Sequence, residues 1–188
     1  MENAFVYRIT HDTNEARLNI LGIPNQPGMG ARVFRALADS KIHVDMILYN
    51  NVADEQSNLS FLIWKKDIPA AKEVAEIFIN DVGGKGILVE EDFARISIIG
   101  RGLHNPSGIV AEMFAAFGNE NINMQMISTS ERRVSCLVKA IEVERAVWVL
   151  IKQFKLDDAR VDSEISGEKV DFSLPLDAPF DYMLTNEV

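Results

Sequence analysis

Two stretches of the sequence, ARLNILG at residues 16–22 and ARISIIG at residues 94–100, share both their pattern and their ending. Apolar residues occupy the same places in each, and a glycine closes each segment. β-Branched residues favour strands, and glycine is a common breaker at a strand end. Self-similarity of this kind indicates a duplicated unit, so we expect a strand at the same place in each of two copies.

The similarity continues beyond these strands. After a loop that is two residues longer in the second copy, the match resumes at Gly28 and Gly108 and then keeps a constant offset. Residues 28–39 and 108–119 carry apolar residues at helical spacing, which predicts a helix in each copy. The aligned pairs are Ala31 and Ala111, Phe34 and Phe114, Ala36 and Ala116, Ile42 and Ile122, Met46 and Met126, and Ile47 and Ile127.

Further signals complete both copies. Strands are expected at 44–51, 59–64 and 87–90 in the first copy and at 123–130 and 134–139 in the second, with helices at 68–79 and 142–154. The order strand, helix, strand, strand, helix, strand makes an antiparallel sheet with both helices on one face. This is an α+β fold, the ferredoxin-like βαββαβ arrangement, here present twice in tandem.

One strand is missing from the second copy, and one is left over before the first. Residues 155–162 are heavily charged and weakly apolar, whereas residues 4–10 are typical of a strand. The simplest solution is that this N-terminal strand completes the sheet of the second copy. We therefore expect two interleaved units in one rigid body. The expected domains are residues 14–92, residues 93–158 together with the strand 4–11, and a C-terminal tail at 159–188.

The tail combines acidic residues, proline and glycine with apolar residues such as Phe172, Phe180 and Tyr182. Two interpretations remain open: an extended arm that docks on a partner, and a frayed terminus.

Composition excludes several classes of partner. The formal net charge is −9 at pH 7, which argues against nucleic acid because affinity for it comes largely from Lys and Arg. The N-terminus lacks a signal-peptide pattern, and no apolar run of about 18 residues predicts a membrane span. The single cysteine, Cys136, cannot form an internal disulfide and fits a cytoplasmic location. Its place in an alternating strand favours a core residue over a nucleophile.

Groups that could support catalysis are scattered. His11, His43 and His104 are far apart in the sequence and from Cys136, so no zinc-binding pattern is present. The two pairs of glycines near the strand ends lack the third glycine of a dinucleotide-binding loop. We therefore predict no catalytic residue, no metal site and no cofactor, and an enzyme on a ferredoxin-like sheet is disfavoured.

Each copy does carry a glycine-containing loop between its first strand and its first helix, at residues 22–28 and 100–108. Such a loop offers free backbone N–H groups at the positive end of a helix, where a carboxylate can bind. The alternative is that the proline and glycine only start the helix. The residues alone leave both interpretations open.

Residues 121–131, NINMQMISTSE, closely resemble the N-I-x-x-x-M-I-S-T-S-E signature of the tandem ACT region of aspartate kinases, the separately translated β subunit in particular. Residues 12–16, 24–28 and 44–47 are similar to further motifs of that family, and the resemblance covers about residues 4–157. It implies a regulatory chain with no catalysis of its own, because the kinase domain that phosphorylates aspartate is missing from it.

The resemblance also implies a homodimer in which helices and sheets pair between chains. Threonine, lysine or both would bind at the interfaces and report the abundance of the end product to a catalytic aspartate kinase subunit. The chain would in this way mediate feedback inhibition in aspartate-family amino-acid biosynthesis. By motif position, the first site comprises Asn25, Pro27, Gly28, Met29, Gly30, Asp45, Met46, Ile47 and Asn50. The second comprises Asn105, Ser107, Gly108, Ile109, Val110, Asn123, Met126, Ile127, Ser128, Thr129 and Ser130.

Two departures from the family pattern bear on the first site. Asn25 replaces the usual acidic residue, which removes a counter-charge for an ammonium group, and Tyr49 stands where the family usually has glutamine. The loss of one charge-assisted hydrogen bond costs about 1.5–3 kcal/mol. This site is expected to bind a different effector, to bind weakly or to be silent. The alternative function is a stand-alone ACT protein that senses another amino acid and regulates another enzyme or a transporter.

Overall fold

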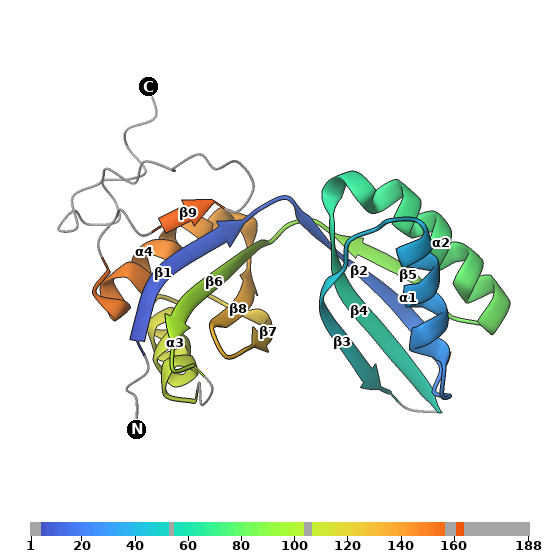
Figure 1. Cartoon of the computed structure of the whole chain (residues 1–188), viewed down its shortest axis with the longest axis horizontal. Coiled ribbons are helices and arrows are strands. Elements are labelled where there is room, and N and C mark those ends of the chain that lie inside the picture. The colour runs from blue at the N-terminus through green and yellow to red at the C-terminus, as the bar shows by residue number, and fades with distance from the viewer. Residues whose placement is uncertain (1–4, 53–54, 104–106, 157–160, 164–188) are drawn as a thin grey trace. The chain divides into compact units, whose positions relative to one another are not determined.

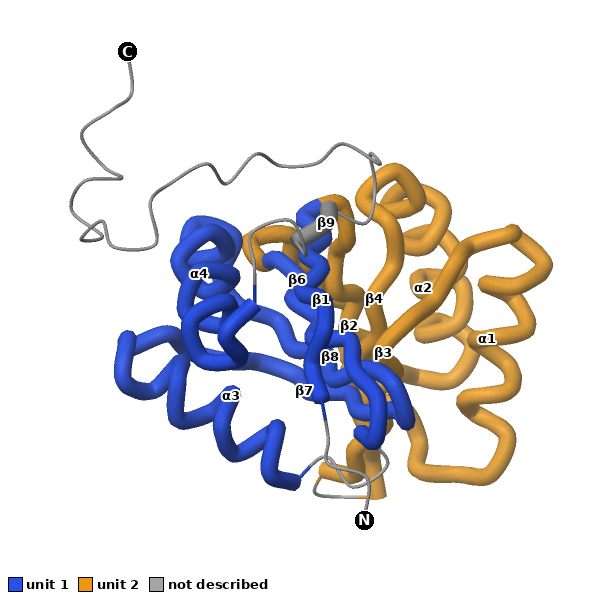
Figure 2. Tube along the Cα trace, turned by 60° about the vertical axis from the view of Figure 1, so that its left-hand side comes forward, with its two compact units in different colours: residues 1–13, 94–188 blue, residues 14–93 orange. Residues whose placement is uncertain are grey.

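The computed structural model describes residues 5–52, 55–103, 107–156 and 161–163 (Figure 1). The chain forms two compact units (Figure 2). Unit 2, in orange, comprises residues 14–93, and unit 1, in blue, comprises the chain on either side of it.

Unit 2 is a four-stranded antiparallel sheet in the order β3-β4-β2-β5, with two helices on one face (Figure 1). Its elements are β2 (Glu15–Pro24), α1 (Met29–Asp39), β3 (Asp45–Asn51), β4 (Gln56–Trp64), a 3₁₀ turn (Lys65–Asp67), α2 (Ile68–Val82) and β5 (Gly86–Glu90). Alternate residues of the strands, such as Leu18 and Phe61, pack against the buried face of α1 at Val33 and Leu37. β4 starts earlier than the sequence predicts, because the backbone of Gln56 pairs with Val52 across the hairpin.

Unit 1 repeats this arrangement around its own core. Its sheet has the order β7-β8-β6-β1-β9. The elements are β1 (Phe5–Asp12), β6 (Ala94–Arg101), α3 (Ser107–Asn119), β7 (Gln125–Thr129), β8 (Arg133–Val138), a 3₁₀ turn (Ala140–Glu142), α4 (Val143–Phe154) and β9 (Val161–Ser163). Cys136 lies on β8 in the core of this unit, and burial raises the pKa of its thiol, as expected for a structural residue.

The duplication extends to the turns. α1 ends in a bond from the Ile42 N–H to the Leu37 carbonyl at 3.0 Å, and α3 ends in the equivalent bond from Ile122 to Phe117 at 2.9 Å. The alignment of the two copies from the sequence is therefore confirmed at the level of the backbone.

The N-terminal strand completes the sheet of unit 1, as the strand count predicts. β1 pairs antiparallel with β6, just as β5 pairs with β2 in unit 2. Val6 and Ile9 belong to the core of unit 1. A Cβ on Gly100 would lie 2.5 Å from the Phe5 carbonyl oxygen, so only glycine allows this close approach of the two strands. The interleaved α+β fold is confirmed.

The expectation that no strand follows α4 is wrong at one point. Residues 161–163 form β9, which pairs parallel with β1. A strand ladder is made by backbone N–H and C=O groups, so a charged segment can join a sheet edge without an apolar pattern. The two interpretations of the tail concern residues that lie mostly outside the described part of the chain.

Candidate functional site

The start of α1 offers backbone donors without a side-chain cap. Gly28 precedes the helix with φ at 91°, a left-handed conformation that favours glycine. The hydrogen-bond ladder of the helix begins with the Arg32 N–H, which donates to the Gly28 carbonyl at 3.1 Å. The amides of Gly30 and Ala31 therefore precede the ladder, and no side chain among the described residues caps them.

The loop before α1 is held in place and leaves the helix start open. The Asn25 N–H donates to the Glu55 carbonyl at 2.8 Å, which ties the loop to the residue before β4. The Gln26 N–H donates to the Pro24 carbonyl at 2.9 Å. Among the described residues, no atom beyond the chain neighbours and the helix's own backbone lies within 4 Å of a Cβ built on Gly28 or Gly30, so a small ligand has room to approach these amides.

The start of α3 is similar in exposure but different in geometry. α3 begins at Ser107, so Gly108 is its second residue, whereas the aligned Gly28 lies just before α1. Within the described part of the chain, no atom outside the helix's own backbone and the chain neighbours lies within 4 Å of the Cβ position of Gly108 either. The first-turn amides of α3 belong to Ser107, Gly108, Ile109 and Val110. Ile109 is buried, and Asn105 lies outside the described residues.

The predicted first-site residues are spread along β3: Asp45 and Met46 lie at its start, Ile47 near its middle and Asn50 near its end. Asp45 is opposite Leu62 and Asn50 is opposite Asn58 of the neighbouring strand. Since Pro24, which precedes the loop to α1, is opposite Gln56, only Asn50 is at the end of the sheet where that loop lies. A strand rises about 3.3 Å per residue, which puts Asp45 roughly 15 Å from Asn50. Within one chain, the structure does not bring Asp45 and Met46 to the helix start.

The second site is divided in the same way. Ser128 and Thr129 close β7 and are exposed, and the Gly100 N–H donates to the Arg132 carbonyl at 3.0 Å, which ties that hairpin to the end of β6. The loop to α3 leaves from this end. Ser130 uses its hydroxyl in the hairpin turn, where Oγ accepts the Arg133 N–H at 3.1 Å. Met126 and Asn123 lie toward the other end of the strand.

A pair of equivalent β-bulges was not predicted from the sequence. Met46 has φ at 45° and Met126 has φ at 39°, and the strand register shifts at both places. The Asp45 carboxylate supports the first bulge, since its Oδ1 accepts the Met46 N–H at 2.7 Å. Bulges bend edge strands and redirect the side chains that follow. The only feature of the sequence at these bulges is the methionine that both copies share, and methionine is not a residue type that favours a positive φ.

The edge strands also expose apolar side chains. Ile47, Leu48 and Tyr49 are consecutive on β3 and at least 40% exposed, and Ile127 is exposed on β7. β3 and β7 are at the edges of their sheets, so each pairs with a strand on one side only among the described residues. An exposed apolar edge of this kind is a template for pairing with another chain.

Comparison with known proteins identifies the family. The sequence profile of the ACT domain matches residues 18–76, in unit 2, and residues 96–154, in unit 1. The chain belongs to the ACT domain family. This ACT-domain pair is 33% identical over 165 residues to an aspartokinase of Mycolicibacterium smegmatis, and the match covers 86% of the chain but 39% of that relative. The chain thus spans well under half the length of this curated relative.

Two solved structures match the ACT-domain pair over nearly their whole length. The ligand-free regulatory subunit of aspartate kinase from Thermus thermophilus has a TM-score of 0.74 and 34% identity, with 79% of this chain and 98% of that chain covered. A structure of aspartokinase alpha and beta subunits gives a TM-score of 0.74 and 34% identity, with 80% and 99% covered. The ACT-domain pair therefore corresponds to the regulatory part of aspartate kinases, as the resemblance predicts.

Proposed function

We propose that this chain is the regulatory component of an aspartate kinase and binds threonine or lysine at the starts of α1 and α3. The observation that carries the proposal is the pair of uncapped amides at Gly30 and Ala31, with open space in front of them. Oriented N–H donors and the positive end of the helix dipole stabilise a carboxylate. The choice of amino acid follows from the family resemblance.

The ammonium group of the effector needs acceptors of its own, since an unpaired buried charge costs several kcal/mol. In unit 1, the hydroxyl groups of Ser128 and Thr129 lie at the helix-start end of the sheet and can accept hydrogen bonds. In unit 2, Asn50 is the predicted site residue of β3 that lies at that end. The remaining predicted residue with a negative charge, Asp45, is at the far end of β3.

A second chain would bring the separated parts of the first site together. If the edge strand of one chain pairs antiparallel with an edge strand of another, the start of one strand lies beside the end of its neighbour. Asp45 of the partner subunit would then approach the helix-start end of β3. We therefore infer a homodimer with effector sites at its interfaces, consistent with the exposed apolar side chains of Ile47, Leu48 and Tyr49.

Regulation in this proposal is a difference in affinity. The effector binds one arrangement of the dimer more tightly than another and so shifts the population that the catalytic subunit meets. The chain itself contributes no catalytic residue. The cytoplasmic location expected from the single cysteine remains a prediction, and no helix among the described residues has the length and hydropathy to cross a membrane.

Asn25 and Tyr49 favour one alternative, in which a stand-alone ACT protein senses a different amino acid. Both residues depart from the family pattern; Asn25 lies in the exposed loop before α1, and Tyr49 is exposed on β3. The effector is the property that separates the two functions, together with co-purification of a kinase subunit.

Thermal unfolding in the presence of each common amino acid tests the proposal. A ligand at 100 times its Kd stabilises the folded state by about 2.7 kcal/mol, which raises the melting temperature by roughly 5–10 °C. We expect this shift for threonine or lysine and not for their D-enantiomers. A shift with another amino acid alone would support the stand-alone sensor, and the absence of any shift would count against both functions.

A further inference from the structure

The chain passes between the two units twice. The boundaries fall at residues 13–14 and 93–94. The first connector, residues 13–14, leaves β1 after Asp12 and enters β2 at Glu15. The second, residues 91–93, leaves β5 after Glu90 and enters β6.

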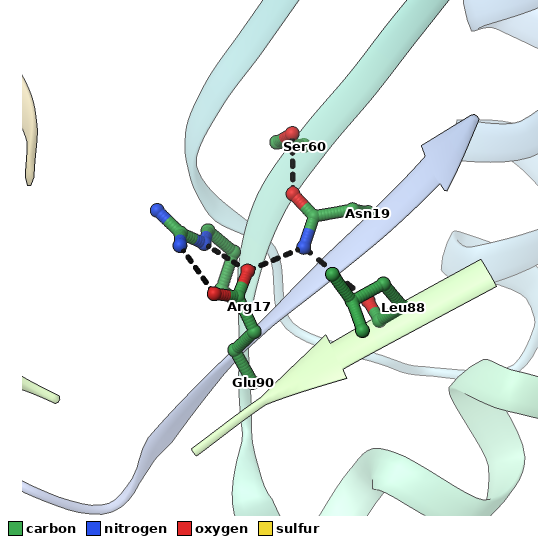
Figure 3. A network of polar contacts seen from close by, with 5 residues as sticks. All are labelled: Arg17, Asn19, Ser60, Leu88 and Glu90. Atoms are coloured by element: carbon green, nitrogen blue, oxygen red, sulfur yellow. Dashed lines mark hydrogen bonds and ion pairs between the residues drawn. The ribbon is translucent and has the colours of Figure 1, made fainter. Parts of the chain in front are cut away.

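The second connector follows Glu90, whose carboxylate accepts hydrogen bonds from two neighbouring side chains. Glu90 accepts two hydrogen bonds from Arg17, at 2.9 Å from Nε and 2.7 Å from an Nη (Figure 3). Asn19 donates to Glu90 Oε2 at 2.8 Å and to the Leu88 carbonyl at 3.3 Å, and the Ser60 hydroxyl donates to Asn19 at 2.7 Å. The bond from Arg17 is the main reason that the pKa of Glu90 lies below its ordinary value. A bidentate pair with a second donor fixes the end of β5.

The first connector leaves unit 1 from an equivalent pair. Asp12 is the last residue of β1 and lies opposite Arg95 in the ladder with β6, as Glu90 lies opposite Arg17 in unit 2. An Arg95 guanidinium nitrogen is 3.7 Å from an Asp12 carboxylate oxygen. Both side chains are more than nine-tenths buried, with exposures of 8% and 5%. A buried charge that loses its partner is strongly unfavourable, so this pair resists separation.

The two ion pairs and the two connectors form a closed ring. The chain runs from Asp12 through the first connector to Arg17, which binds Glu90. From Glu90 it runs through the second connector to Arg95, which binds Asp12. Each connector is therefore tied to the other at both of its ends.

We propose that this connector ring, residues 12–17 and 90–95, acts as one two-stranded tether in which the two connectors move together. Two segments cross-linked at both ends move together, because neither can shift without straining an ion pair that also holds the other. Any change in one unit that reaches the other along the chain has to pass through this ring. The tether does not depend on the proposed effector, and the expectation that the units form one rigid body stays a prediction.

Amide hydrogen exchange of the full chain, followed by mass spectrometry of peptides that cover residues 13–14 and 91–93, tests the tether. In Glu90→Gln we expect exchange to accelerate about tenfold in both connectors, although the change lies next to only one of them. Arg17→Gln, which breaks the same pair from the other connector, is expected to accelerate the same two peptides.

Asp81→Asn is the matched control, because it removes the charge of the exposed ion pair between Arg32 of α1 and Asp81 of α2, away from the ring. We expect no change in either connector for this variant. Acceleration confined to residues 91–93 in Glu90→Gln, and to residues 13–14 in Arg17→Gln, would overturn the tether, as would unchanged exchange in both. None of these results depends on whether an amino acid binds.

Discussion

We expect Gly108→Leu to weaken effector binding to unit 1 strongly. Gly108 lies in the first turn of α3, and among the described residues no atom beyond its chain neighbours and the helix's own backbone lies within 4 Å of its Cβ position, which leaves room for a side chain to start there. The replacement of glycine by leucine also stabilises a helix, by up to about 1 kcal/mol. The leucine side chain fills the space from which a carboxylate reaches the first-turn amides. Losing such charge-assisted bonds weakens binding by at least about 100-fold, measured by calorimetry with the amino acid that stabilises the unchanged chain.

Gly118→Leu provides the control in the same helix. Gly118 has the same open Cβ position with respect to the described residues outside its own helix, but it lies near the end of α3. This variant is expected to bind the effector normally. In α1, Gly30→Leu tests the first site, and Ala38→Leu, at the exposed far end of that helix, is its control. Equal affinity in Gly108→Leu and Gly118→Leu would place the site elsewhere.

Ile9→Ala is expected to destabilise unit 1 by about 2–5 kcal/mol, because it opens a cavity in a packed core. Ile9 lies on β1 and is fully buried in the core of unit 1, although it belongs to the opposite end of the chain from the other strands of that sheet. Each unit holds one tryptophan: Trp148 on α4 in unit 1 and Trp64 on β4 in unit 2. Urea unfolding followed by Trp148 fluorescence in a Trp64→Phe background therefore reports on unit 1.

Ile20→Ala is the corresponding change in unit 2, where Ile20 is fully buried under α1 and α2. It is expected to lower the transition that Trp64 reports in a Trp148→Phe background. The interleaved assignment of β1 would be contradicted if Ile9→Ala shifted the Trp64 transition and left that of Trp148 unchanged.

Much of the fold is predictable from the sequence because the same pattern of apolar residues occurs twice in the chain. The strand at residues 16–22 and its copy at 94–100 have the same apolar spacing, and counting strands is enough to assign β1 to unit 1. β9 could not be predicted in this way, because its pairing with β1 uses backbone groups that nearly all residue types share. The extent of β4 is likewise set by hairpin pairing and not by its apolar residues.

The candidate site was only partly predictable. A glycine loop before a helix is visible in the sequence, so the starts of α1 and α3 were expected to offer free amides. The positive φ of Met46 and Met126 has no sequence signature. Asp45 is separated from the helix start because of the direction in which β3 runs, and a match of sequence motifs carries no information about strand direction. The bond between Arg17 and Glu90 joins residues 73 positions apart and depends on sheet register alone.

The central claim is that backbone amides at the helix starts bind the effector carboxylate. Titration of the ¹⁵N-labelled chain with the stabilising amino acid, followed through its amide signals, measures this directly. We predict the largest shifts, saturating with one affinity, at Gly30 and Ala31 of α1 or at Gly108 and Ile109 of α3. Saturable binding that leaves all four of these amides unmoved while signals elsewhere shift would contradict the claim.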